Sequence, residues 1–158
     1  MNMPIPPHLI YPLYTGIIAV AVVLLVPKQE IRRLFIYAVI FGGILNVAAI
    51  TFNGLLGFGG HINFGPFGVG SCSFFAPLAW TLWFILFFWF LPEQVVLKVI
   101  YVISTAVYSM FFSNVLVNLE IFVWKLHRVF YPLFLYMVWF SIAVWGYQRV
   151  RAWLEQLE

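Results

Sequence analysis

Three histidines, one glutamate and one cysteine are the side chains in this sequence best suited to chemistry. His8, His61 and His127 could ligate a divalent metal or titrate near neutral pH, and Glu120 could add a carboxylate ligand. No two histidines have the i, i+4 spacing of a helical metal site. We therefore predict no cofactor, and His8, His61 and His127 remain candidates for a metal or haem site under a third hypothesis, an intramembrane metalloprotein.

A nucleophilic mechanism would need Ser71, Cys72 or Ser73, because these residues share a glycine-rich linker with His61. No known catalytic motif supports such a pairing, and we predict no catalytic residues. The intramembrane enzyme belongs to the same third hypothesis. The single cysteine excludes an internal disulfide.

The composition defines the medium that must surround these residues. The chain has 158 residues, of which 65% are hydrophobic and 8% are charged, whereas soluble domains carry about 25% charged residues. Apolar runs dominate the sequence, so its solvent is lipid. Stretches in which basic and aromatic residues are interleaved are too few for binding nucleic acid. We predict an all-α, polytopic transmembrane helix bundle that forms one domain over residues 1–158.

Five apolar spans are expected, and the tail after residue 148 is expected to continue as an amphipathic surface helix. The third span is crowded with aromatic residues on every side, which predicts wide contact with lipid. Residues 57–73 form a glycine-rich linker, whose phenylalanines favour a loop folded onto the bundle or dipping into the interface. The spans are predicted at about 9–26, 34–56, 74–91, 95–119 and 129–148.

The basic residues predict an orientation. With five spans and the N-terminus outside, six basic residues lie inside and only Lys125 and Arg128 lie outside, which satisfies the positive-inside rule. The N-out, C-in topology places His8, His61 and His127 on the outer side. The six inner residues are Lys28, Arg32, Arg33, Lys98, Arg149 and Arg151.

Small and polar residues fall on one face of two spans, as expected where helices pack closely. An alternative for mid-span Asn46 is direct contact with a substrate. The predicted packing residues are Ala38, Gly42, Asn46, Ala49 and Asn53 in the second span, and Thr105, Ser109 and Ser113 in the fourth. The predicted outer ligand site comprises His61, Asn63, Asn114, Asn118 and Glu120.

Several short segments resemble a group of small, uncharacterised five-span membrane proteins of Gram-positive, often spore-forming, bacteria. The similarity extends over nearly the whole chain, and it implies a multi-pass protein of the bacterial cytoplasmic membrane and no catalytic residues. The segments are Val26-Pro27-Lys28, Asn63-Phe64-Gly65-Pro66, Ala76-Pro77-Leu78-Ala79-Trp80, Phe90-Leu91-Pro92-Glu93 and Leu116-Val117-Asn118-Leu119.

We therefore predict a non-catalytic membrane protein that binds a small molecule or lipid, or that docks a partner as a subunit of a membrane assembly. Its expected partners are the lipid bilayer and either further copies of itself or other membrane subunits. The alternative is an oligomeric channel or facilitator for small solutes, lined by Asn46 and the hydroxyl stripe.

Overall fold

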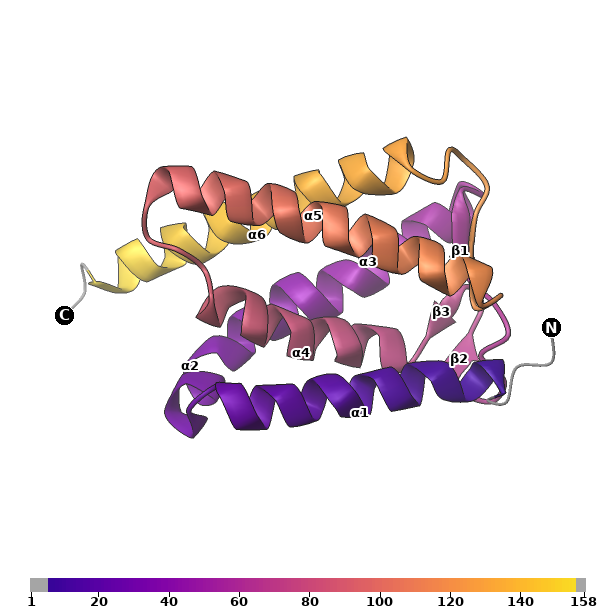
Figure 1. Ribbon diagram of the computed structural model, residues 1–158, viewed down its shortest axis with the longest axis horizontal. Coiled ribbons are helices and arrows are strands. Elements are labelled where there is room, and N and C mark those ends of the chain that lie inside the picture. Colours follow the sequence, from indigo (N-terminus) through magenta and orange to yellow (C-terminus); the bar gives the residue numbers. More distant parts are fainter. Residues whose placement is uncertain (1–5, 156–158) are drawn as a thin grey trace. The chain divides into compact units, whose positions relative to one another are not determined.

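The computed structural model describes residues 6–155, most of which are helical (Figure 1). Two compact units are formed, unit 1 by the chain up to Phe90 together with Val115–Leu126, and unit 2 by Leu91–Asn114 and the chain from His127 onward. Within the part of the chain that the structure describes, four helical segments are long and apolar enough to cross a membrane, namely Pro7–Leu25, Lys28–Leu55, Val95–Asn118 and Phe130–Trp153. The predicted all-α class is therefore confirmed.

Unit 1 begins with two helical segments separated at Pro27. Helix α1 (Pro7–Leu25) has proline in its first turn, where no hydrogen bond is lost. The next segment starts directly after Pro27 and consists of α2 (Lys28–Ala38), the π-helix η1 (Val39–Ile44) and α3 (Leu45–Leu55). The charged residues 28–33, which the prediction placed before the span, are thus already helical.

Helix α4 (Phe75–Trp89) forms the centre of unit 1 and packs against α1, α2, η1 and α3. Ala76 and Phe84 have no exposed surface, and within the helix only Leu78 and Trp89 are exposed. The expectation that this helix meets lipid over much of its surface is therefore wrong. Its aromatic side chains pack against one another and fill the core. The ring centroids of Phe84 and Phe88, for example, lie 5.6 Å apart.

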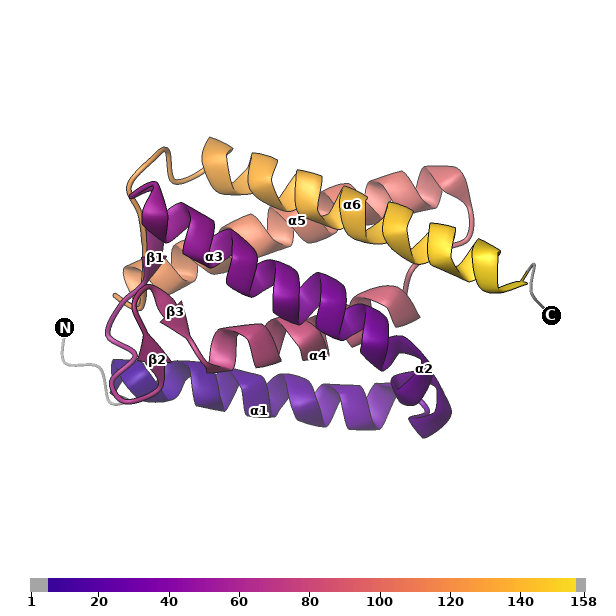
Figure 2. The same ribbon diagram turned by 180° about the vertical axis from the view of Figure 1, so that it is seen from behind.

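The glycine-rich linker is folded onto the helices of unit 1 (Figure 2). It contains three of the four β-strands found within residues 6–155. Strand β1 (Gly59–His61) pairs antiparallel with β4 (Phe122–Trp124), and β2 (Gly68–Val69) pairs with β3 (Cys72–Ser73). Gly59 lies so close to the carbonyl of Val123 that a side chain there would collide with it. None of these strands is predicted from the sequence.

Unit 2 contains most of α5 (Val95–Asn118) and all of α6 (Phe130–Glu155). A hydrogen bond links the side chains of Ser113 on α5 and Tyr136 on α6. Phe140 and Ala143 have no exposed surface. Helix α6 continues beyond the predicted end of its span, which agrees with the helical tail expected after residue 148.

Candidate functional site

His61 is the most enclosed ionisable group of the candidate site. It ends strand β1, opposite Phe122 of β4, and only 4% of its surface is exposed. Its Nδ1 atom lies 3.2 Å from the backbone oxygen of Ser71, and its Nε2 atom lies 2.9 Å from the hydroxyl oxygen of Tyr11. The ring is therefore held between the linker and α1.

These contacts define the tautomer of His61. A carbonyl oxygen only accepts hydrogen bonds, so Nδ1 carries the proton and donates to Ser71, while Nε2 accepts from the Tyr11 hydroxyl. Burial lowers the pKa of His61 from 6.5 to about 4, although the hydrogen bond to the Ser71 carbonyl opposes this shift. Because both ring nitrogens are engaged, His61 is poorly placed to activate a nucleophile.

Asn63 and Glu120 are brought together as the sequence predicted. The Asn63 side-chain amide donates a 2.7 Å hydrogen bond to the backbone carbonyl of Glu120. Both residues have positive φ, 54° for Asn63 and 58° for Glu120. The Glu120 side chain is exposed, so its carboxylate faces outward from a backbone that Asn63 secures.

Glu120 occupies the turn that ends α5. Its N–H bonds to the carbonyl of Val117, and the N–H of Ile121 bonds to the carbonyl of Leu116. This pair of bonds is a Schellman motif, in which the left-handed position usually belongs to glycine. Asn118 is the last residue of α5, and it too is exposed. Asn118 and Glu120 therefore form a polar rim at the helix end.

Asn114 is engaged in unit 2. Its side-chain amide donates hydrogen bonds of 2.9 Å to the carbonyls of Met110 and Arg128, and so connects α5 to the start of the last helical segment. The structure thus groups His61, Asn63, Asn118 and Glu120 in unit 1, and it gives Asn114 a structural role in unit 2.

Two of the three possible nucleophiles in the linker, Cys72 and Ser73, are directed at backbone carbonyls. The thiol of Cys72 lies 3.6 Å from the carbonyl of Ser73, and the hydroxyl of Ser73 donates to Phe67. Burial raises the pKa of the Cys72 thiol, which disfavours the reactive thiolate. His61 contacts the backbone of Ser71 and not its hydroxyl.

The three candidate metal ligands lie in different surroundings. The ring of His8 is 6.3 Å from that of Phe67, and His61 is enclosed as described. His127 accepts bonds at Nδ1 from the backbone N–H groups of Val129 and Phe130, and so caps the start of α6. Across residues 6–155, no three His, Cys, Asp or Glu residues form a group that could hold a metal ion.

Most of the predicted packing residues are buried. A methyl group on Gly42 would lie 2.5 Å from the backbone oxygen of Trp80, so this glycine allows η1 to touch the α4 backbone. Asn46 is 2% exposed, and its Oδ1 atom has no hydrogen-bond partner within the described chain. The buried set is Ala38, Gly42, Asn46, Asn53, Thr105, Ser109 and Ser113, while Ala49 is half-buried.

Tyr11 is the site residue that sequence reasoning missed. Tyrosines near the start of a span usually lie at the headgroup boundary, but Tyr11 is only 7% exposed and bonds to His61. A pairing over 50 residues leaves no local periodicity, so the sequence contains no signal for it.

Fold and composition define this chain as a helical protein with four segments suited to crossing a membrane. Comparison with known proteins adds no narrower class, since no protein-family model, curated protein or solved structure matches the chain.

Proposed function

We propose that the protein is a non-catalytic integral membrane protein of a bacterial cytoplasmic membrane, which binds a lipid or small molecule or docks a partner subunit. The observation that carries this proposal is the enclosure of His61 between Tyr11 and Ser71. Its ring nitrogens bond within the fold. The side chains of Asn118 and Glu120, at the end of α5, are instead exposed and suit contact with a ligand or partner.

Large apolar side chains on the surface support a protein embedded in lipid. Val23 and Leu24 on α1 are 73% and 77% exposed, and Leu55 on α3 is 82% exposed. Such surfaces are unfavourable in water but suit the hydrocarbon core of a bilayer.

A five-span, N-out, C-in topology is part of this proposal. Helix α4 has 15 residues, which is about 22 Å at 1.5 Å per residue and less than the roughly 30 Å hydrocarbon core. The adjacent apolar residues Phe74, Phe90 and Leu91 lengthen the apolar stretch to the span predicted at 74–91. The distribution of basic residues supports the orientation.

Native mass spectrometry of gently extracted protein tests the binding proposal. A monomer or dimer that retains a lipid or small molecule of defined mass, or a stoichiometric partner subunit, is the expected result. A ligand-free symmetric oligomer of four or more copies would overturn it in favour of a channel. Stoichiometric metal by elemental analysis, or haem bands in the optical spectrum, would instead support a metalloprotein.

One observation favours the channel as a second candidate. The Oδ1 atom of Asn46 is buried in a long apolar helix without a partner in the described chain, and neutral amides can line a pore. Solute flux into liposomes tests this candidate. Flux that scales with the amount of protein and disappears in an Asn46→Leu variant of normal stability would support a channel, whereas absence of flux would reject it.

A further inference from the structure

One face of α2 combines two basic side chains with two exposed apolar ones. Lys28, Arg32, Phe35 and Ile36 have the spacing i, i+4, i+7 and i+8, which places them within about 100° around the helix axis. All four are exposed, with Phe35 and Ile36 at 54% and 58%. These four residues are called the basic stripe below.

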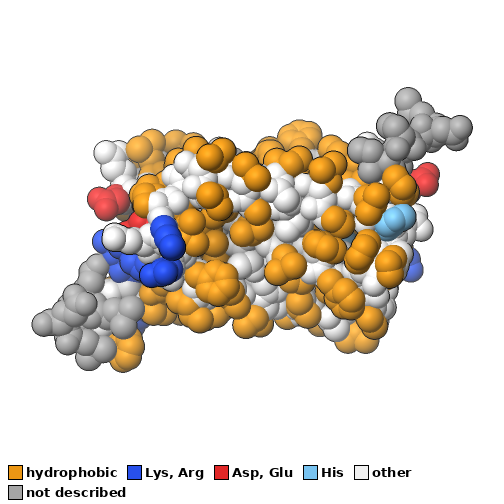
Figure 3. Space-filling model, turned by 90° about the horizontal axis from the view of Figure 1, so that it is seen from below, with side chains coloured by type: hydrophobic (Ala, Val, Ile, Leu, Met, Phe, Trp, Pro, Cys, Tyr) orange, Lys and Arg blue, Asp and Glu red, His pale blue; other side chains and the backbone are white. Residues whose placement is uncertain are grey.

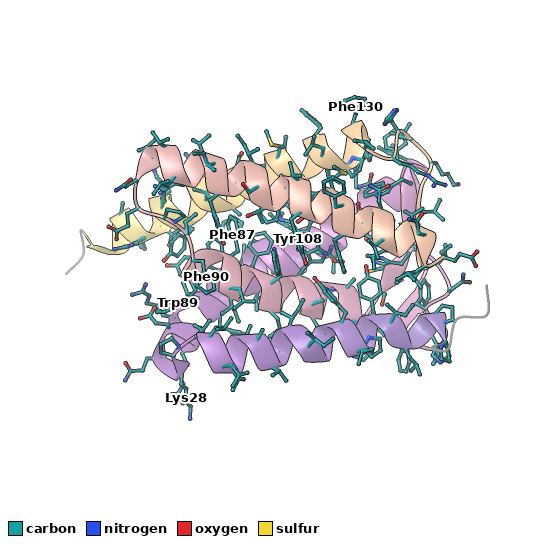
Figure 4. The ribbon with its side chains drawn as sticks, viewed as in Figure 1. Lys28, Phe87, Trp89, Phe90, Tyr108 and Phe130 are labelled. Carbon is teal, nitrogen blue, oxygen red and sulfur yellow. The ribbon has the colours of Figure 1, made fainter. Side chains whose placement is uncertain are left out.

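The opposite side of α2 belongs to the core of unit 1. Leu34 is 1% exposed and Ala38 is fully buried, since α2 packs against α4. The basic stripe is therefore the outer face of a helix whose inner face is already occupied. Figure 4 shows the Lys28 side chain pointing away from the neighbouring helices at the start of α2.

The charge of the basic stripe is uncompensated by the nearest acid. Glu30 lies about 160° around the helix from Arg32, and its carboxylate pairs with Arg33 at 3.1 Å. Within residues 6–155, no ion pair involves Lys28 or Arg32. A second positive contribution comes from the helix itself, since α2 starts after Pro27 with no side-chain cap on its first N–H groups.

The order of residues along the basic stripe matches the order of groups in a phospholipid. The basic side chains lie in the first two turns of α2, and the exposed Phe35 and Ile36 follow one to two turns later, where the continuous apolar sequence begins. Figure 3 shows most of the Lys and Arg side chains of the face seen there at one end, next to hydrophobic side chains and beside Asp or Glu side chains, with a further Lys or Arg side chain at the other end.

We propose that the basic stripe of α2 binds an anionic phospholipid, with the phosphate between Lys28 and Arg32 and an acyl chain along Phe35 and Ile36. This inference rests on the proposed membrane function and names the lipid class that the protein would take. Net negative charge distinguishes the preferred headgroup, because a zwitterionic lipid would bring its own cation against Lys28 and Arg32.

Native mass spectrometry with added lipid tests the inference. The purified full chain is titrated with phosphatidylglycerol or with phosphatidylcholine of the same acyl chains, and the lipid adducts are counted. The wild type should retain phosphatidylglycerol preferentially. A Lys28→Gln, Arg32→Gln double variant should reduce that preference roughly tenfold or more, because each basic residue near the headgroups contributes strongly to binding.

Two matched variants separate the site from general charge effects. A Lys125→Gln, Arg128→Gln variant removes two exposed basic residues elsewhere and should keep the preference. A Lys28→Arg, Arg32→Lys variant keeps the charge at the site and should also keep it. The inference is overturned if the Lys28→Gln, Arg32→Gln variant is folded and keeps the wild-type preference for phosphatidylglycerol. It is also overturned if the Lys125→Gln, Arg128→Gln variant loses as much of that preference as the Lys28→Gln, Arg32→Gln variant does. Retention of a different ligand would then leave the broader binding proposal standing.

Discussion

The hydroxyl of Tyr11 donates a 2.9 Å hydrogen bond to Nε2 of His61. This bond joins α1 to strand β1 of the linker, and the rings of the two residues meet edge to face at 5.1 Å. The linker is therefore attached to α1 through a neutral histidine, and protonation of this histidine would break the bond.

Acidification should destabilise the protein through His61. Because burial lowers its folded pKa from 6.5 to about 4, the unfolded state binds more protons between these pH values. The stabilising contribution is complete above pH 6.5 and is lost as the pH falls toward 4, by on the order of 3 kcal/mol. Thermal unfolding in detergent at a series of pH values measures this loss.

A His61→Gln variant provides the comparison for this prediction. It should be less stable than the wild type at pH 7, but its stability should change less between pH 6.5 and 4. A variant with the same pH dependence as the wild type would show that other groups cause the loss. A Tyr11→Phe variant should keep the pH dependence, since His61 is still present.

Gly42→Ala should destabilise the protein by about 1–3 kcal/mol, because the added methyl group collides with the Trp80 carbonyl. Gly16→Ala is the matched control, since nothing lies within 4 Å of a Cβ atom at Gly16. This control should be neutral or slightly stabilising. Equal melting temperatures for the two variants would contradict the close packing of η1 on α4.

Asn46→Leu should change stability or association, and we expect a gain of about 1 kcal/mol because an unpartnered buried oxygen is removed. Asn53→Leu should have the opposite effect, since the Asn53 amide donates to the Ala49 carbonyl at 2.7 Å. Thermal unfolding together with size-exclusion chromatography measures both. If Asn46→Leu leaves stability and association intact but abolishes a measured transport activity, the packing interpretation is wrong.

Glu120→Gly should stabilise the protein by about 1 kcal/mol, because glycine adopts the left-handed conformation at φ 58° without strain. If the carboxylate belongs to the outer site, the same variant should retain less ligand in native mass spectrometry. Glu120→Gln is the matched control, since it removes the charge and keeps the side-chain size. Retention that is unchanged in both variants would exclude the carboxylate from binding.

Cys72 should react slowly with an impermeant maleimide in intact cells. Its thiol is partly buried and its pKa is raised, so the fraction of thiolate is small. Val69→Cys in a Cys72→Ser background should react faster, since Val69 is 72% exposed and pairs with residue 72 across the β2–β3 ladder. Labelling is followed by the mass shift of the protein.

The same experiment tests the N-out topology. Gln29→Cys in the Cys72→Ser background places an exposed thiol at the start of α2, which the topology assigns to the inner side. It should react only after the cells are permeabilised. Labelling of Gln29→Cys but not Val69→Cys in intact cells would invert the orientation.

The helices could be predicted from the sequence because their signals are local. Apolar runs predict these helices, and Pro92 marks where α4 has ended. The second span is predicted to start at residue 34, whereas α2 already begins at Lys28, directly after Pro27. The buried positions of Gly42 and Asn53 follow equally from helical spacing. These features depend on neighbours within a few turns.

The linker could not be predicted because its contacts join distant residues. Strand β1 pairs with β4, and His61 meets Phe122 only after α4 and α5 have intervened. A three-residue strand has no periodicity that distinguishes it from a loop. Likewise, the sequence predicts His61 in an outer ligand site. Its burial could not be predicted, because its partners, Tyr11 and Ser71, are brought to it only by the fold.

The π-helix η1 absorbs one extra residue within the helical segment from Lys28 to Leu55. A π turn accommodates about one residue more than an α turn, and the backbone N–H of Leu45 accordingly reaches Ile40. Deleting one residue from Val39–Ile44 would therefore allow a continuous α-helix in which α3 keeps nearly its present rotation relative to α2, whereas a further inserted residue that is not absorbed would rotate α3 by about 100°. The deletion would leave Asn46 and Asn53 facing the core and the insertion would turn them away from it, so loss of a residue here is less disruptive than gain of one.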